Sequence, residues 1–247
     1  MSIKKYWYKG GGVVHARPYA SPTDPLRPLC NSSELKVDIK TKTEELPDYD
    51  GPSGGLAATS SRIEGADVTL TLYDLNYANL AMAYWGSTAA VAAGSVSGEV
   101  VVANPGSLTR LAFVGAANVV VTDASGSITY VLGVDYTLTG AGLLIPDTTT
   151  IPAGASIHVA YTYGDQAVVE AMTDGAKAMY LLLDGINSAM DGKPRVVDLW
   201  KVQFEAGQGI DYKGDKFATL QLKGKLLRDD TQTGAGASKF FRETIVP

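Results

Sequence analysis

Few residues of this chain have the chemistry of a catalytic or ligand-binding group. Its 247 residues include two histidines, His15 and His158, and one cysteine, Cys30. His158 stands in an alternating run, where we expect it on the solvent face of a strand, and His15 belongs to the first predicted strand. Neither has a serine or aspartate at a spacing that indicates a catalytic triad. A single cysteine excludes an intrachain disulfide and a multi-cysteine zinc site, so we expect Cys30 to be a buried or half-buried free thiol.

Two acidic pairs and one glycine-containing segment were the remaining candidates for ligand binding. Asp48 with Asp50, and Asp229 with Asp230, lack the ligand number and register of a calcium loop and are interpreted as solvated turn residues. The segment 209–215 has glycines five residues apart but lacks the Lys-Ser/Thr of a phosphate loop, so a hairpin turn explains it better. The motifs HExxH, GxSxG and GxGxxG are absent. The sequence therefore predicts no enzyme, no metal and no cofactor.

The composition is typical of a globular, β-rich protein. Apolar residues make up 45% and charged residues 19% of the chain, with 27 Gly and 13 Tyr against 5 Phe. This mixture favours strands and tight turns. The net charge of −5 does not provide the basic footprint of a general nucleic-acid binder. The longest mostly apolar stretch, 111–121, is too short to cross a bilayer and no signal peptide is visible, so we expect no membrane segment and synthesis in a reducing cytoplasm.

Two pairs of segments alternate between apolar and polar residues, as half-buried strands do. The pairs are 35–46 with 66–75, and 196–204 with 217–227. Between the first two lies a stretch from Leu46 to Ser61 that is rich in Pro, Gly and Ser and is interpreted as a long functional loop.

Two helices are predicted beside these strands. The first covers 75–86, where Gly86 is placed to end it, and a weaker helical pattern covers 166–172. The first helix would align four side chains on one stripe: Leu75, Ala78, Met82 and Trp85.

The segment from Gly94 to Gln166 differs from the rest of the chain in charge. It has five acidic residues, Arg110 as its only basic residue and no lysine, so it carries −4, whereas the remainder has 20 basic and 21 acidic residues. Seven short apolar or alternating runs, separated by turn residues, predict a small Ig-like β-sandwich. We therefore predict two domains, a discontinuous β domain of residues 1–93 and 167–247 and an inserted acidic β-sandwich of residues 94–166.

The order of these elements and three sequence fragments resemble a known family. The fragments are ELPDYDGPSGG (45–55), LYDLNYANLA (72–81) and LLLDGINSAMDGK (181–193). Over residues 10–92 and 167–247 the chain resembles the major tail tube protein of long-tailed bacteriophages with flexible, non-contractile tails, the siphovirus type. The resemblance implies a mainly β fold, a tail-tube β-sandwich or barrel domain with one short helix.

The family also implies a function in self-assembly. Hexameric rings, whose strands complete one β-barrel around a lumen, stack into a tube that conducts double-stranded genomic DNA without binding it specifically. The protein would belong to the virion tail, after synthesis in the cytoplasm of the bacterial host. Its partners would be further copies of itself and tail proteins such as the tape measure and the tail terminator.

The resemblance assigns two groups of site residues. In such tubes a long loop of one ring reaches the next, which implies inter-ring contacts with Tyr49 as the best anchor. That loop comprises Pro47, Asp48, Tyr49, Asp50 and Gly51. The polar strand faces would line the lumen, with the candidates Lys36, Asp38, Lys40, Asp67, Thr69, Thr71, Lys201, Gln203 and Glu205. These faces, with Lys42 and Lys223, carry an excess of positive charge, whereas a DNA conduit is expected to be neutral or acidic. Either some faces are assigned wrongly or acidic loops compensate.

Other functions remain open on the sequence. The inner tube of a contractile injection system is one, although a bulky insert would obstruct a sheath. A surface adhesin or carbohydrate-binding module is another, and an enzyme is a third. The adhesin would need an aromatic groove in the insert, for which the candidates are Tyr130, Tyr136, Tyr161 and Tyr163. We expect instead that the insert lies outside the tube, where its negative charge keeps the polymer soluble.

Overall fold

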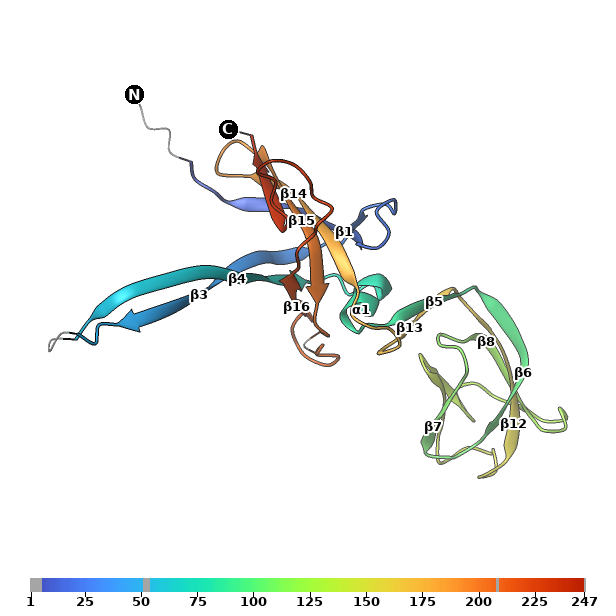
Figure 1. Ribbon diagram of the computed structural model, residues 1–247. Coiled ribbons are helices and arrows are strands. Elements are labelled where there is room, and N and C mark those ends of the chain that lie inside the picture. Colours follow the sequence, from blue (N-terminus) through green and yellow to red (C-terminus); the bar gives the residue numbers. More distant parts are fainter. Residues whose placement is uncertain (1–5, 51–53, 208, 247) are drawn as a thin grey trace. The chain divides into compact units, whose positions relative to one another are not determined.

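The structure is a computed structural model that describes residues 6–50, 54–207 and 209–246 (Figure 1). Strands account for 54% of the chain and helix for 3%, which confirms the predicted mainly β fold. The chain forms two compact units, which we call the host unit (1–88 with 169–247) and the inserted unit (89–168). The predicted insert, 94–166, lies within the inserted unit.

One antiparallel sheet organises the host unit. Its strand order is β2-β1-β14-β15-β16-β4-β3, and β17 pairs with β15 beside β16. The strands are β1 (Gly10–Pro18), β2 (Arg27–Pro28), β3 (Ser32–Pro47), β4 (Leu56–Leu72), β14 (Ala178–Asn187), β15 (Lys193–Phe204), β16 (Leu220–Leu226) and β17 (Phe241–Ile245). The predicted strand pairs are therefore confirmed, because β3 pairs with β4 and β15 with β16.

The core of the host unit lies on one face of this sheet. On β4 the side chains of Val68, Leu70 and Leu72 are fully buried, and the intervening residues are not. The register places Leu70 opposite Leu222 of β16, so apolar side chains meet across neighbouring strands. The 2-residue alternation seen in the sequence thus fixes which face is buried. Residues 209–215 lie in the connection between β15 and β16, which runs from Phe204 to Leu220 and is longer than the hairpin turn predicted there.

A single short helix, α1 (Tyr77–Ala83), packs on this core. Asn76 is its N-cap and accepts hydrogen bonds from the backbone N–H groups of Ala78 and Asn79. The helix is shorter than the predicted 75–86, because the chain turns at Trp85, whose φ is 48°. Gly86 is needed for a different reason than the one predicted, since a Cβ there would collide with the carbonyl oxygen of Glu170.

The face of α1 that is buried also differs from the predicted stripe. The fully buried residues are Asn79 and Ala83, whereas Leu75 and Met82 only partly pack on the core. The Asn79 side chain donates to the carbonyl oxygens of Leu29 (3.3 Å) and Asp74 (2.8 Å). A buried amide with these partners joins α1 to the chain on either side of it.

The helix predicted over 166–172 is wrong. Residues Gln166–Glu170 form strand β13, which pairs with β5 (Ser87–Val91). The adjacent β-branched residues Val168 and Val169 favour this conformation. The two segments that connect host and insert therefore run as a two-stranded ribbon.

The inserted unit is a small sandwich. A four-stranded sheet has the order β6-β12-β8-β9, and a three-stranded sheet has the order β10-β11-β7. The strands are β6 (Gly94–Val102), β7 (Ser107–Arg110), β8 (Ala117–Asp123), β9 (Thr129–Tyr130), β10 (Thr137–Thr139), β11 (Gly142–Ile145) and β12 (Ser156–Tyr163). Side chains such as Val121, Leu143 and Ile157 form a core of its own. The predicted β-sandwich is confirmed, although the run 110–114 is mostly loop because β7 ends at Arg110.

Cys30 differs from its prediction as a buried or half-buried thiol. Its side chain is exposed, and its φ of 61° is one that side-chain-bearing residues seldom adopt. The sharp turn between β2 and β3 carries the thiol out of the core. His15 lies in β1 as predicted and is half-buried, and His158 on β12 stands between the buried residues Ile157 and Val159.

Candidate functional site

The hairpin of β3 and β4 continues far beyond the core of the host unit (Figure 1). Its last buried residue is Ala66, and all described residues of 40–50 and 54–64 are exposed. We call these two segments the arm. From Lys40 to Pro47 the arm advances by about 24 Å, at about 3.4 Å per residue. A two-stranded ribbon of this length has no core of its own and is marginal in water without a partner.

The loop predicted from Leu46 to Ser61 is shorter than expected, because both of its ends are strand. Pairing continues to Pro47 opposite Leu56, so the connection is only 48–55. The small residues of 58–61 form a ladder because β3 supplies a partner for each of them, whereas Ala57 lies at a bulge where the register shifts. The Asp48 N–H donates to the carbonyl oxygen of Gly55 (2.8 Å), and the Asp48 carboxylate accepts from the Asp50 N–H (2.9 Å). Of the predicted contact residues, Gly51 lies outside the described residues.

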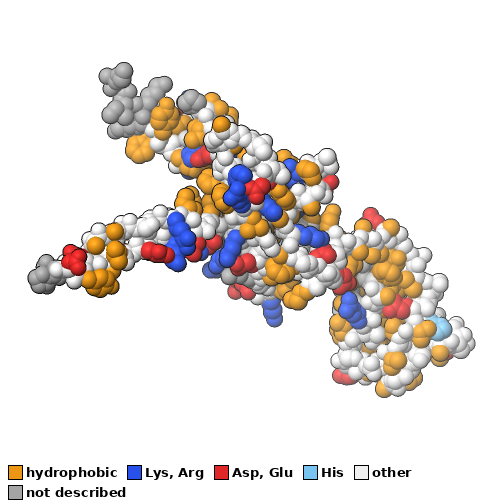
Figure 2. All heavy atoms as spheres, viewed as in Figure 1, with side chains coloured by type: hydrophobic (Ala, Val, Ile, Leu, Met, Phe, Trp, Pro, Cys, Tyr) orange, Lys and Arg blue, Asp and Glu red, His pale blue; other side chains and the backbone are white. Residues whose placement is uncertain are grey.

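Large apolar side chains are exposed along the arm (Figure 2). Ile63 is 71% exposed and Tyr49, at the tip, 83%. Leu46 and Leu56 are also exposed on the arm, and Ile39 is exposed directly before it. Thr41 and Ile63 pair across the two strands of the arm. They continue the face of the hairpin on which Val37 is half-buried nearer the core. An apolar surface on a thin ribbon indicates a place where another protein surface binds.

The arm also has an uneven charge. Acidic residues gather toward the tip, and basic residues lie nearer the sheet (Figure 2). The acidic residues toward the tip are Glu44, Glu45, Asp48 and Asp50, and the basic residues Lys40, Lys42 and Arg62 lie nearer the sheet together with Glu64. Lys42 pairs with Glu44 at 3.6 Å, and Lys40 pairs with Asp67. The carboxylates of Asp48 and Asp50 form no ion pair among the described residues.

The predicted lumen residues fall largely on one surface of the host sheet. Across β3, β4 and β16 the register aligns Lys36 with Thr69 and Lys223. On the same surface lie Glu34, Asp38, Asp67, Thr71, Gln203, Gln221 and Lys225. The Lys36 ammonium lies 2.8 Å from the Asp38 carboxylate, and Lys40 pairs with Asp67. Each of these lysines therefore lies next to a carboxylate. Asp38 and Asp67 are already counted in the charge expected from the sequence, so an excess of positive charge remains on this surface, where Lys36, Lys40, Lys223 and Lys225 outnumber Glu34, Asp38 and Asp67.

Two of the predicted lumen residues have different surroundings. The Lys201 ammonium lies 4.7 Å from the centre of the Tyr19 ring, so it belongs to an aromatic cluster. Glu205 lies beyond the end of β15, where its N–H donates to the carbonyl oxygen of Lys223 (2.8 Å).

This aromatic cluster was not predicted. The rings of Tyr180 and Trp200 stack with centroids 6.0 Å apart, with the guanidinium of Arg17 4.8 Å from the tyrosine and that of Arg242 5.0 Å from the tryptophan. The Tyr180 hydroxyl donates to Asp198 (2.6 Å). Burial, and then this hydrogen bond, raises the pKa of Tyr180. The members come from β1, β14, β15 and β17, so no local signal in the sequence could have revealed the cluster.

A second polar network adjoins it. The Tyr19 hydroxyl donates to Asp229 (2.7 Å), which also accepts from Thr231 and Gln232. Burial raises the pKa of Asp229, but the hydrogen bonds from Gln232, Tyr19 and Thr231 outweigh it and lower the pKa well below its usual value. Asp229 is therefore a buried, fully partnered structural residue rather than the solvated turn residue predicted. Its neighbour Asp230 is exposed and pairs with Arg228 and Lys239.

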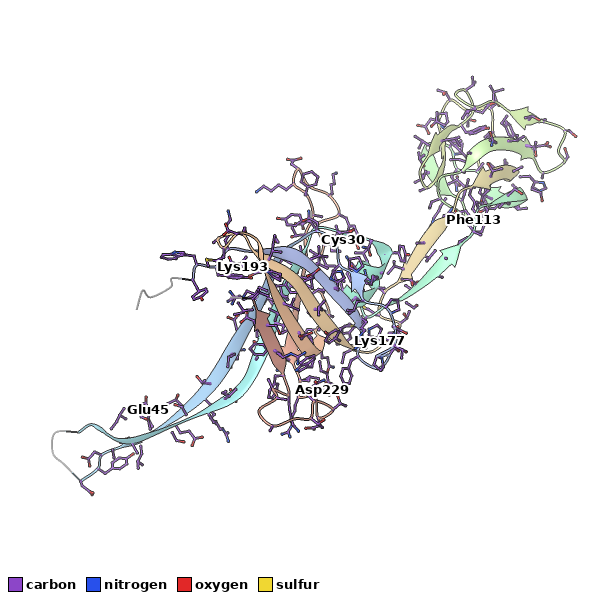
Figure 3. The ribbon with its side chains drawn as sticks, turned by 90° about the horizontal axis from the view of Figure 1, so that it is seen from above. Cys30, Glu45, Phe113, Lys177, Lys193 and Asp229 are labelled. Atoms are coloured by element: carbon purple, nitrogen blue, oxygen red, sulfur yellow. The ribbon has the colours of Figure 1, made fainter. Side chains whose placement is uncertain are left out.

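The described residues contain no cluster of three or more histidine, cysteine or acidic side chains that could hold a metal ion. Among them there is also no helix long and apolar enough to cross a membrane. In the inserted unit, Tyr130, Tyr136 and Tyr161 are buried, and Tyr163 stacks on Phe113 at 3.9 Å (labelled in Figure 3). These four tyrosines therefore do not form an open aromatic groove.

Comparison with protein families gives one result. A family model described as "Protein of unknown function UCP028589" matches residues 7–244. The chain belongs to this family. The match runs across both the host unit and the inserted unit. No curated protein matches the chain.

Proposed function

We propose that this protein is a structural, non-enzymatic component of a bacteriophage tail tube. In this proposal it assembles into hexameric rings that stack into the tube, through which double-stranded DNA passes without specific binding. The protein is made in the host cytoplasm and becomes part of the virion tail, next to the tape measure and tail terminator proteins.

The observation that carries the proposal is the arm. It exposes Ile63, Tyr49 and other apolar side chains on a ribbon that has no core. Burying these side chains against another copy stabilises both the arm and the assembly.

The edge of the host sheet supports the same conclusion. Strand β3 ends the strand order, so one side of its backbone has no partner strand among the described residues. A long open edge tends to pair with a strand of another chain. Closing several such sheets into one barrel removes the open edges and turns the polar sheet surface toward a water-filled lumen.

Self-association is tested by size-exclusion chromatography with light scattering over a wide range of protein concentration. We expect the mass to rise with concentration beyond that of a monomer. A monomer at every concentration, with no polymer after prolonged incubation, would contradict the proposal.

A further inference from the structure

A cavity of about 400 Å³ lies in the host unit beside α1. Its apolar lining comes from Met82 and Trp85 at α1, Met179 on β14 and Phe204 on β15. Its charged lining comes from Arg17, Arg27, Lys177, Asp24 and Asp174. An apolar cavity with a few charged groups at its edge is the usual form of a binding pocket for a side chain or small molecule.

Arg17 and Arg27 are the half-buried cations of this cavity that make no ion pair with a described residue, and Arg17 already lies over the Tyr180 ring. The Arg27 guanidinium donates to the amide oxygen of Asn79 (2.8 Å). Desolvation lowers the pKa of Arg27. The Asp74 carboxylate attracts this guanidinium only from beyond ion-pair distance, so a carboxylate in direct contact with Arg27 would reduce the cost of burying it. Lys177, by contrast, already pairs with Asp174 (2.6 Å).

Trp85 is held at this cavity by an unusual backbone conformation. Its φ of 48° is left-handed, which costs a bulky residue on the order of 1 kcal/mol or more. The carbonyl oxygen of Trp85 accepts from the Asp174 N–H (2.8 Å), and the Gly86 N–H donates to Ala81 (2.9 Å). Strain of this kind is retained where the surrounding structure fixes a side chain at a site.

The tip of the arm has the complementary chemistry. Tyr49 is 83% exposed and stands between two carboxylates, Asp48 and Asp50, that have no ion pair among the described residues. The Asp50 N–H donates to the Asp48 carboxylate (2.9 Å), which shapes the tip as a turn. The Tyr49 ring matches the apolar lining of the cavity, and the carboxylates of the tip match the Arg27 guanidinium, which makes no ion pair with a described residue.

The tip and the cavity lie at opposite ends of the host unit. Figure 3 shows Glu45 toward the tip of the arm and Lys177 at the other end of the sheet, and in Figure 1 α1 likewise lies opposite the arm. The two surfaces therefore cannot meet within one chain. A contact between them joins two copies head to tail, and such a contact repeats into an open polymer.

We propose that the tip Asp48–Tyr49–Asp50 of one copy docks in the α1 cavity of a second copy. Tyr49 enters between Met82 and Trp85, and a carboxylate of the tip pairs with Arg27. This inference rests on the proposed self-assembly and specifies the surface that receives the arm.

Cross-linking between two differently labelled cysteine variants tests the docking. Both carry Cys30→Ser, which removes the only cysteine. One adds Asp50→Cys, which leaves Tyr49 in place, and the other adds Gly175→Cys at the cavity, where a new Cβ has no atom within 4 Å. The matched control replaces this second variant by Gly214→Cys, another glycine with free space around its Cβ but on the β15–β16 loop. Equal amounts are mixed, assembled and treated with a short bis-maleimide.

We expect a heterodimeric adduct of Asp50→Cys with Gly175→Cys in yield at least fivefold above that with Gly214→Cys. Polymers in which the Gly175→Cys yield does not exceed the control would overturn the docking site and leave self-assembly standing. A mixture that stays monomeric in light scattering, as the unsubstituted protein also does, would overturn the proposed function and the docking together. If only the variants fail to assemble, doping each into an excess of unsubstituted protein restores the polymer in which the yields are compared.

Discussion

Replacing Ile63 by Thr separates the role of the arm in assembly from its role in folding. Ile63 lies beyond the core and is 71% exposed, so it contributes little to the stability of a single copy. Threonine keeps the β-branched side chain that favours a strand. We therefore expect the free energy of unfolding of the monomer to change by less than about 0.5 kcal/mol.

Assembly should respond much more strongly. Burying an isoleucine contributes about 1.5–3 kcal/mol, and because Ile63 is 71% exposed in one copy, about 1–2 kcal/mol of this depends on the partner surface. A loss of about 1.4 kcal/mol per contact raises the dissociation constant about tenfold. Sedimentation of the polymer over a concentration series gives the critical concentration, which we expect to rise by about this factor.

The matched control is Ile128→Thr in the inserted unit, where Ile128 is 55% exposed. It makes the same chemical change at a similarly exposed site, and we expect it to alter neither unfolding nor assembly. If Ile63→Thr polymerises at the concentration of the unsubstituted protein, the arm surface is not an assembly contact. If it unfolds in markedly less urea, the arm is part of the folded core and the reasoning fails for another reason.

Three further predictions concern other parts of the molecule. Asn79→Leu leaves the carbonyl oxygens of Leu29 and Asp74 without their donor, so urea unfolding should show a loss of about 3 kcal/mol; a loss under 1 kcal/mol would contradict the role of this amide. Because its folded-state pKa is depressed, Asp229 contributes stability that is present above the ordinary carboxyl pKa and is lost as pH falls toward the folded value. Asp229→Asn should therefore be less stable than the parent at pH 7, and the difference should shrink at pH 3; a constant difference would refute it. Replacing 95–165 by a Gly/Ser linker should leave tubes of unchanged diameter and ring spacing, and failure to form rings would show that the insert belongs to the wall.

Alternation was the sequence feature that predicted the fold best. The side chains of Val68, Leu70 and Leu72 are buried as predicted. In a strand with one buried face every second side chain points into the core, so the apolar residues of the alternating run identify that face. The charge composition likewise predicted that the insert is a unit of its own, and it forms its own core around Val121 and Ile157. These signals are local, and the energy behind them is the burial of neighbouring apolar groups.

The errors arose where the deciding contacts are distant in sequence. The sequence predicts a loop over 58–61 because these residues follow a stretch rich in Pro, Gly and Ser, yet pairing with β3 determines their conformation. The pattern at 166–172 suited a helix, but β5 offered a partner strand. The cluster of Arg17, Tyr180 and Trp200 joins strands more than 160 residues apart, so only the folded sheet reveals it.

Electron microscopy of the purified protein after concentration tests the central claim most directly. The account predicts hollow tubes, or stacks of rings with sixfold symmetry, in which an arm of each copy contacts the next ring. A field of isolated particles of monomer size, at concentrations and incubation times that allow polymerisation, would contradict it.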